Sequence, residues 1–276
     1  MSLDYTVTFA CYNQHAYTHD CIKSMIESGT DASKIVLVDN NSNPETQSYY
    51  ETIDLPIQLI KNKSNMGCGV AWNQGILLNQ SEWTIIMNND VVVQNNFAER
   101  LINSAIDAKL KVMSPAMIEG HLNYDHLIQF DAYSEKMSRY IRPNNQHLVC
   151  LLVHSDVWSE IGYFAANPKL MGYEDTIFFN LLRKNNIKSG ITSHAWLHHF
   201  GSITQKAIKL ERKISEKDPL GDRHNYKILG KTILERKLDK FKRNRQNKIF
   251  CKNELATFGL TIHGTNFNDP AHLNWQ

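Results

Sequence analysis

The chain has 276 residues, a formal net charge of +2, 42% hydrophobic residues and 21% charged residues, a composition ordinary for a globular protein. This length fits one large domain, or one domain with a substantial appendage. The pattern excludes a membrane-spanning segment, a disulfide framework and a clustered cysteine zinc site, because no apolar run approaches about 18 residues and the five cysteines are scattered.

Charge is distributed unevenly along the chain. Residues 205–252 hold 16 Lys/Arg against 6 Asp/Glu, a local balance of +10, which leaves the remainder of the chain acidic. We therefore treat 205–276 as a basic, mostly helical C-terminal extension that could meet an anionic surface. The N-terminus shows no signal-peptide pattern, so we expect a cytoplasmic protein, with peripheral contact to the inner face of the membrane through the basic helices as an open hypothesis.

The first 110 residues alternate between predicted strands and helices. Short β-branched or apolar runs predict four strands, and amphipathic or small-residue segments predict helices between them. The alternation is typical of βαβ units and a mainly parallel sheet. The predicted strands are Tyr5–Ala10, Lys34–Val38, Ile57–Lys61 and Trp83–Met87, and the predicted helices are Asp20–Ser28, Pro44–Tyr50, the later part of 62–79, and Phe97–Ala108.

The regular alternation of strands and helices ends after residue 111. Strands are predicted at Lys111–Met117 and Leu148–His154, whereas 118–147 has no period and is expected to be irregular. A helix follows Glu174–Asp175, a strand is predicted over Ile187–Trp196, and the tail from Gln205 to about Lys248 is predicted to be helical with a break at 218–221.

Polar residues follow several of the predicted strands. Asn13, Asp39, Asn88–Asp90 and Glu174–Asp175 all come at such positions, and in a parallel sheet they emerge at the same edge, where ligands bind. The carboxylate of Asp90 with the amides of Asn88 and Asn89 can hold a divalent cation and bond sugar or phosphate oxygens. An ordinary Asn/Asp turn explains the same residues. No G-x-G-x-x-G or P-loop pattern occurs, so neither a dinucleotide site nor a P-loop is supported.

Six segments in order resemble the inverting glycosyltransferases of family 2, which have the GT-A fold. They are TFACYNQ, IVLVDNNS, NKSNMGCGVAWNQGI, IIMNNDVVV, MGYEDTIFFNLLRKNN and LHHFGSIT, and together they span roughly residues 5–205. The sequence looks closest to the rhamnosyltransferase-like branch of surface polysaccharide synthesis. The resemblance implies a GT-A domain over 1–204, with a Rossmann-like nucleotide-sugar half at 1–110 and an acceptor and catalytic half at 111–204.

The resemblance also implies roles for residues of the nucleotide-sugar half. Asp39 would contact the base or ribose of a UDP- or dTDP-linked donor, with the backbone near Tyr12 and Asn13 completing the pocket. The residues that would shape the nucleotide-sugar site are Asn65, Gly67 and Asn73.

The remaining roles concern metal and catalysis. Asp90 matches the last residue of the family's D-x-D-type motif, which binds Mn²⁺ or Mg²⁺ on the donor diphosphate, and His198 or His199 would be a later ligand. Asp175 would be the general base that takes the proton of the acceptor hydroxyl, and Glu174 would orient hydroxyl groups. The motif here is Asn88-Asn89-Asp90, with one carboxylate where many relatives carry more, which weakens the expectation of strict metal dependence.

Structural explanations exist for the same residues. Glu174 and Asp175 in the first turn of a helix complement its dipole. Adjacent strand residues face opposite ways, so at most one of His198 and His199 is a ligand, and we favour His198. The expected partners are a nucleotide-sugar donor and a glycan or lipid-linked acceptor, and not nucleic acid. The alternative functions are a non-catalytic nucleotide- or sugar-binding protein and, less favoured, a nucleotidyltransferase, whose phosphate loop is absent from CYNQH.

Overall fold

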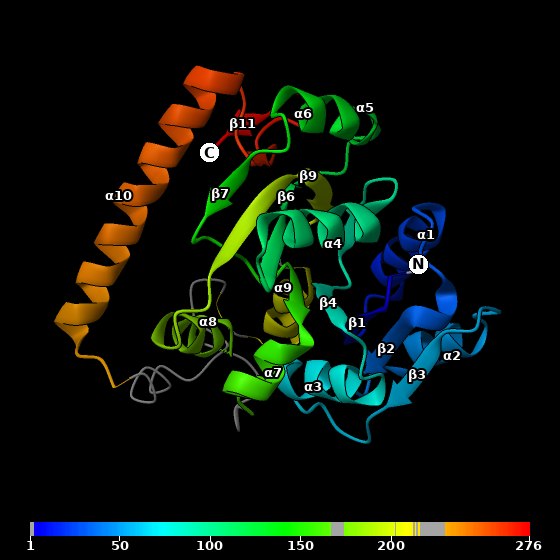
Figure 1. The fold of residues 1–276 in the computed structure, drawn as a ribbon. Coiled ribbons are helices and arrows are strands. Elements are labelled where there is room, and N and C mark those ends of the chain that lie inside the picture. Colours follow the sequence, from blue (N-terminus) through cyan, green and yellow to red (C-terminus); the bar gives the residue numbers. More distant parts are fainter. Residues whose placement is uncertain (1–2, 167–173, 202, 212, 214, 216–229) are drawn as a thin grey trace.

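The computed structural model describes residues 3–166, 174–201, 203–211, 213, 215 and 230–276. Its centre is one mixed sheet in the order β11-β10-β6-β8-β4-β1-β2-β3, with β5 and β7 joined to it through β9. Helices flank the sheet and a long C-terminal helix runs along one side (Figure 1). The predicted α/β fold with a mostly parallel sheet is confirmed.

The first half alternates strand and helix as predicted. Strands β1, β2, β3 and β4 are mutually parallel, and β1 lies between β2 and β4. The helix predicted from Asp20 begins earlier, because the turn at Gln14 already has its backbone in the left-handed region and leads straight into the helix. The elements are β1 (Tyr5–Cys11), α1 (His15–Glu27), η1 (Ala32–Lys34), β2 (Ile35–Asp39), α2 (Pro44–Glu51), β3 (Gln58–Lys61), α3 (Cys68–Leu78) and β4 (Trp83–Asn88).

The second half contains structure that the sequence did not predict. Region 118–147, expected to be irregular, forms two short helices and a strand, because Phe130 and Met137 are buried against Trp196. Helices this short span too few turns to show a period in the sequence. The elements are β5 (Val91–Val93), α4 (Phe97–Ala108), β6 (Val112–Glu119), α5 (Tyr124–Ile128), α6 (Phe130–Lys136), β7 (Ile141–Pro143), β8 (Cys150–His154), α7 (Ser155–Ile161), α8 (Glu174–Lys184) and β9 (Ser189–His199).

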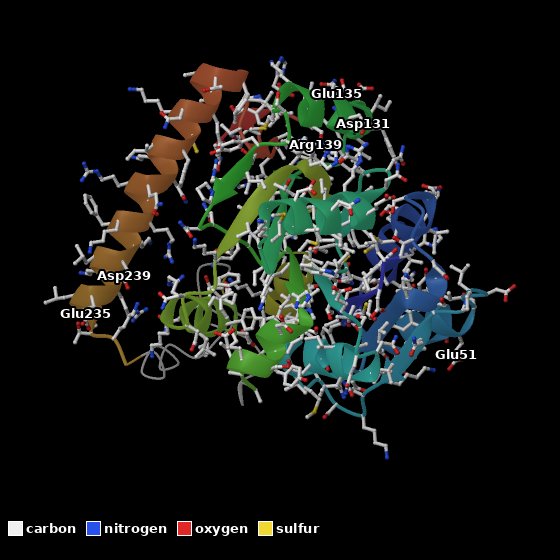
Figure 2. All side chains as sticks on the ribbon, in the orientation of Figure 1. Glu51, Asp131, Glu135, Arg139, Glu235 and Asp239 are labelled. Carbon is white, nitrogen blue, oxygen red and sulfur yellow. The ribbon has the colours of Figure 1, made fainter. Side chains whose placement is uncertain are left out.

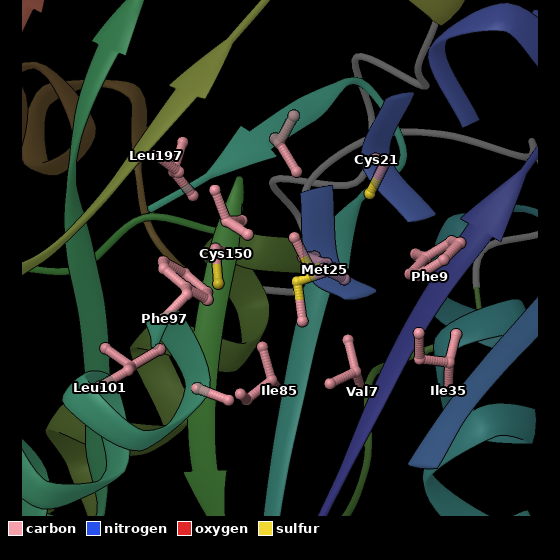
Figure 3. Packing of buried hydrophobic residues seen from close by; sticks show 14 of the residues in the cluster. Val7, Phe9, Cys21, Met25, Ile35, Ile85, Phe97, Leu101, Cys150 and Leu197 are labelled. Atoms are coloured by element: carbon pink, nitrogen blue, oxygen red, sulfur yellow. The ribbon is translucent and has the colours of Figure 1, made fainter. Parts of the chain in front are cut away.

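Strand β4 is buried on both faces, as its apolar run predicts. Ile85 and Met87 point into one cluster with α1 and α4, while Ile86 points into a second cluster with α3, α7 and α8. Figure 3 shows the first cluster, with Ile85 between Val7 and Phe97. Strand β8 runs antiparallel between β4 and β6, so the sheet changes from parallel to mixed where the second half begins.

The C-terminal segment is only partly helical. After α9 (Ile203–Glu211) and α10 (Ile233–Phe258) come β10 (His263–Thr265) and β11 (Asn274–Trp275). Strand β10 pairs in parallel with β6, so the last residues extend the central sheet. The predicted break at 218–221 lies outside the described residues, and the boundary at 204 stays a prediction.

A buried ion pair fastens α10 to the sheet. Arg142 of β7 donates from Nε and one Nη to the two carboxylate oxygens of Glu254, each at 2.7 Å. Both side chains are at most 5% exposed. Removing one partner would leave the other charge buried without compensation.

We therefore expect Glu254→Ala to lower the free energy of unfolding by about 3–5 kcal/mol, measured by urea denaturation. The matched control is Asp239→Ala on the same helix, which breaks the partly exposed pair between Asp239 and Lys231 and should cost no more than about 1 kcal/mol. Equal losses in the two variants would contradict this account of how α10 is held.

Candidate functional site

The ends of three parallel strands bring three of the predicted polar groups together, whereas Glu174 and Asp175 lie in the first turn of α8. Cys11 of β1 pairs with Asp39 of β2, and Ala10 pairs with Asn88 of β4. The loops that carry Asn13, Asp39 and Asn88–Asp90 therefore leave the sheet side by side at one edge. This is the arrangement that the strand pattern predicts, and it follows from the parallel register.

Asp39 is fully buried at the end of β2. Its Oδ1 accepts a hydrogen bond from the backbone N–H of Ser42 at 2.9 Å. Its Oδ2 has no hydrogen-bond partner within the described part of the chain. A buried carboxylate oxygen with spare acceptor capacity is costly unless a ligand N–H or O–H completes it, which suits the contact to a base or ribose.

Asn13 connects the first two loops of this edge. Its backbone N–H donates to Ser42 Oγ at 2.8 Å, and its side-chain oxygen accepts from the backbone N–H of Asn43 at 2.7 Å. Its φ of 55° lies in the left-handed region, which asparagine tolerates better than most residues. Tyr12 precedes it, half-buried, at the exit of β1.

Asn40, which sequence reasoning missed, fastens the loop before α3 onto β2. Its amide donates to Asn65 Oδ1 at 3.0 Å, and its oxygen accepts from Asn62 and from the backbone of Met66. Asn65 Oδ1 also accepts from the N–H of Gly67, whose φ is 82°. Asn65 and Gly67 thus shape the loop at the start of α3. The signal for Asn40 was its place directly after Asp39.

Asn73 lies further along α3 and holds the segment that contains Phe164. Its amide donates to the carbonyl of Phe164 at 2.8 Å, and its oxygen accepts from the N–H of the same residue at 3.0 Å. These two bonds tie α3 to the chain leading toward α8. A Cβ at Gly69 would lie 3.1 Å from Cγ of Glu174, so the glycine lets Glu174 approach the helix closely.

Glu174 and Asp175 form the first turn of α8. Glu174 is buried. Asp175 is half-buried, and its Oδ1 accepts from the backbone N–H of Thr176 at 2.6 Å and from its hydroxyl at 3.2 Å. Burial first, and then the carboxylates of Glu174 and Asp90, raise the pKa of the Cys68 thiol to about 12.

The three residues after β4 have different surroundings. Asn88 is half-buried at the strand end. Asn89 is buried, and its amide donates to Thr18 Oγ1 of α1 at 2.8 Å, which fixes the turn. Asp90 is also buried, and its Oδ2 accepts from the N–H of Ile203 at 3.3 Å.

The other oxygen of Asp90 faces His199. Asp90 Oδ1 lies 3.4 Å from His199 Nε2, and Glu119 Oε1 lies 3.3 Å from His199 Nδ1. His263 of β10 completes the row, with its Nε2 at 3.5 Å from Glu119 Oε2. Burial lowers the pKa of His199, but the Asp90 and Glu119 carboxylates outweigh it and raise the pKa to about 9. The pKa of Glu119 is lowered by the side chains of His199 and His263.

His198, the residue that the sequence favoured, lies elsewhere. Its neighbour on β5 is Val92, whereas His199 pairs with Val91 directly after Asp90. Its Nε2 is buried and has no hydrogen-bond partner in the described residues, and its ring meets Phe200 edge-on at 5.1 Å. Burial lowers the pKa of His198 to about 4, so it is neutral at pH 7. The structure brings His199, and not His198, to Asp90.

The donor set at Asp90 suits a divalent cation that is completed by its substrate. No group of three or more His, Cys, Asp or Glu side chains with ligand spacing occurs among the described residues. A carboxylate and an imidazole nitrogen 3.4 Å apart are, however, the ligand types that divalent metals share in proteins. Glu119 behind Nδ1 supplies the outer carboxylate that usually orients a ligating histidine. A cation held by one or two side chains takes its remaining ligands from phosphate oxygens and water.

A profile of the family described as Glycosyl transferase family 2 matches residues 6–166. The chain belongs to this family. The family is one of glycosyltransferases. The matched span includes Asp39 and Asp90 and ends before Glu174, Asp175 and His199. No curated protein gives a significant match.

Solved structures share this fold at 14% sequence identity. GalNAc-T7 with UDP, GalNAc and Mn²⁺ aligns with a TM-score of 0.56 over 71% of this chain and 43% of its own. TarS 1–349 of S. aureus aligns with 0.55 over 78% and 67%. The mannosyltransferase PcManGT of Pyrobaculum calidifontis, with GDP-Man and Mn²⁺, aligns with 0.55 over 77% and 61%. The chain thus spans 43% of the first of these proteins, and the likeness concerns the fold.

Among the described residues, no helix combines the length and apolar character needed to cross a bilayer.

The raised pKa of His199 predicts a pH-dependent stability. The folded protein binds this proton more tightly than the unfolded chain, whose histidine pKa is about 6.5. The stabilisation is therefore fully present below about pH 6.5 and is lost as the pH rises through about 9, by a few kcal/mol in total.

Urea denaturation of the metal-free protein between about pH 6 and about pH 10 measures this loss of stability, because this range spans the histidine pKa of the unfolded chain and that of the folded protein. His199→Asn should flatten the profile in that window, and Glu119→Gln should flatten it in part. An unchanged slope in His199→Asn would show that the proton is held elsewhere.

Proposed function

We propose that this enzyme transfers a sugar from a UDP- or dTDP-linked donor to a hydroxyl of a glycan or lipid-linked saccharide, with inversion at the anomeric carbon. The branch we infer is the rhamnosyltransferase-like one of surface polysaccharide synthesis, on the strength of the six ordered segments described above. The observation that carries the proposal is the buried pair of Asp90 and His199. It lies at the same sheet edge as Asp39, whose Oδ2 has no hydrogen-bond partner among the described residues.

The nucleoside is proposed to lie over the ends of β1 and β2. Asp39 Oδ2 accepts from the base or ribose, and it is already buried and oriented by the bond from Ser42 to Oδ1. The backbone at Tyr12 and Asn13 lines the other side, and the Asn65–Gly67 loop borders the sugar. Because Asn40 and Asn13 fix these loops in place before a ligand arrives, binding costs little further ordering.

The diphosphate is proposed to meet Asp90, with Asn88 beside it and Asn89 holding the turn. Asp90 and His199 are the residues that would hold Mn²⁺ or Mg²⁺, and Glu119 would orient the imidazole. A bound divalent cation offsets the negative charge that develops on the departing nucleoside diphosphate. That GalNAc-T7 and PcManGT are described with Mn²⁺ and a nucleotide or nucleotide sugar supports this proposal.

Asp175 is proposed as the general base. Its carboxylate stands in the first turn of α8, where hydrogen bonds from Thr176 orient Oδ1. A carboxylate within hydrogen-bond reach of the acceptor hydroxyl takes its proton as the oxygen attacks the anomeric carbon. Glu174, packed against Gly69 of α3, links this turn to the donor half and is proposed to orient substrate hydroxyls. A cytoplasmic location belongs to the same proposal.

Turnover of a panel of UDP- and dTDP-sugars tests the role of Asp175 as general base. The reaction is followed with Mn²⁺ present as release of nucleoside diphosphate while the sugar passes to water or to a saccharide acceptor. Asp175→Asn keeps the shape of the side chain and removes the base, so the rate should fall by about 10²–10⁴-fold while donor affinity is retained. Asp156→Asn is the matched control, because Asp156 also begins a helix but pairs with Lys111 at the surface. A wild-type rate in Asp175→Asn would contradict the assignment.

A further inference from the structure

Helix α10 is long and well terminated. Thr232 and Glu235 form a capping box at its start, and Gly259 with φ 69° ends it after 26 residues. Figure 1 shows it along one side of the molecule, outside the sheet and the helices that cover it. Such a helix keeps its shape while presenting most of its surface to the surroundings.

One side of α10 is used to attach it. Glu254 pairs with Arg142, whose guanidinium also lies 5.6 Å from the ring centre of Phe250. Asn247 accepts a hydrogen bond from Asn145 at 3.1 Å. These residues recur at the three- and four-residue spacing that defines a single face of a helix.

The opposite side of α10 carries large apolar side chains that are exposed to solvent. Leu234, Leu238, Phe241 and Ile249 are 78%, 52%, 65% and 52% exposed. The spacing of four, three and eight residues places them on one face, turned away from Glu254. Large apolar residues aligned along an exposed helix mark an interaction surface, whereas scattered ones do not.

Cations surround these apolar side chains. The exposed residues on or beside the same face are Lys237, Lys242, Arg245, Lys248 and Lys252. Each of the three acids of α10 is committed to another contact. Glu235 caps the helix, Asp239 pairs with Lys231, and Glu254 is buried with Arg142. Figure 2 shows Glu235 and Asp239 at the N-terminal end of the helix.

We propose that this outer face of α10, formed by Leu234, Leu238, Phe241, Ile249 and their five neighbouring cations, binds the surface of an anionic phospholipid bilayer. The apolar side chains enter the boundary of the acyl region, and the lysine and arginine side chains extend to the phosphates beside them. Each cation near an anionic leaflet adds to the affinity. The proposal stands apart from the identity of the sugar donor and acceptor.

Two other occupants fit the face less well. A second copy packed face to face would bring the five cations of each helix together, while the acids of α10 are held in other contacts. Nucleic acid would satisfy the cations and leave the apolar side chains without a partner. An anionic bilayer satisfies both kinds of side chain.

The test is sedimentation of the full chain with vesicles of phosphatidylcholine alone and with phosphatidylglycerol added. Wild type should bind the anionic vesicles and release at high salt, since screening weakens the attraction. Lys237→Gln/Arg245→Gln/Lys248→Gln should lose on the order of a hundredfold in partition coefficient. Leu234→Ser/Leu238→Ser/Phe241→Ser should lose at least about tenfold.

The matched control is Ile106→Ser/Ile128→Ser, which removes comparably exposed apolar residues from α4 and α5 and should bind as wild type does. Thermal unfolding checks that every variant is folded. The proposal is overturned if wild type does not bind anionic vesicles, or if the control loses as much as the α10 variants. It is equally overturned if light scattering shows a dimer that depends on Leu238 and Phe241 while vesicles are not bound, or if duplex DNA is bound in preference to vesicles.

Discussion

The site depends on a buried positive charge between two carboxylates. Asp90 and Glu119 flank His199 at 3.4 and 3.3 Å, and all three come from separate parts of the chain. Asp90 is buried and Glu119 is partly buried, and a buried carboxylate without a cation beside it destabilises the fold. The raised pKa of His199 favours an imidazolium that balances them in the metal-free protein. A divalent metal on Asp90 and His199 would require His199 to lose this proton, and the metal would then supply the positive charge. Charge compensation therefore links stability and the proposed chemistry at one point.

The rest of the edge is held by neutral amides. Asn13, Asn40, Asn65, Asn73 and Asn89 each use side-chain hydrogen bonds to fix a loop or a helix start. Asparagine suits this work because one side chain offers both a donor and an acceptor. The loops around the proposed donor pocket are thus ordered by neutral side chains, without charges that would compete for a diphosphate. The acids of this edge are Asp39 at the end of β2 and Asp90 directly after β4.

Local pattern predicted the parallel half of the sheet well, since each strand is a short apolar run and Asp39 and Asp90 follow two of them. It did not predict the partners that depend on distant pairing. Glu119 ends β6 and reaches His199 because β9 pairs with β6, and His263 reaches Glu119 because β10 pairs with β6. Nothing local distinguishes His199 from His198 either. The choice is made by the antiparallel register of β5 and β9, which sets His199 beside the residue that follows Asp90.

The most direct test of the central claim is a thermal-shift measurement with UDP, dTDP and their sugars, each with and without Mn²⁺. A ligand at a hundredfold excess over Kd stabilises the folded state by about 2.7 kcal/mol. The account predicts a nucleotide shift that grows with Mn²⁺, is lost in Asp90→Ala and His199→Gln, and persists in His198→Gln. A melting temperature that no nucleotide raises, or a Mn²⁺-dependent shift that survives in both Asp90→Ala and His199→Gln, would contradict it.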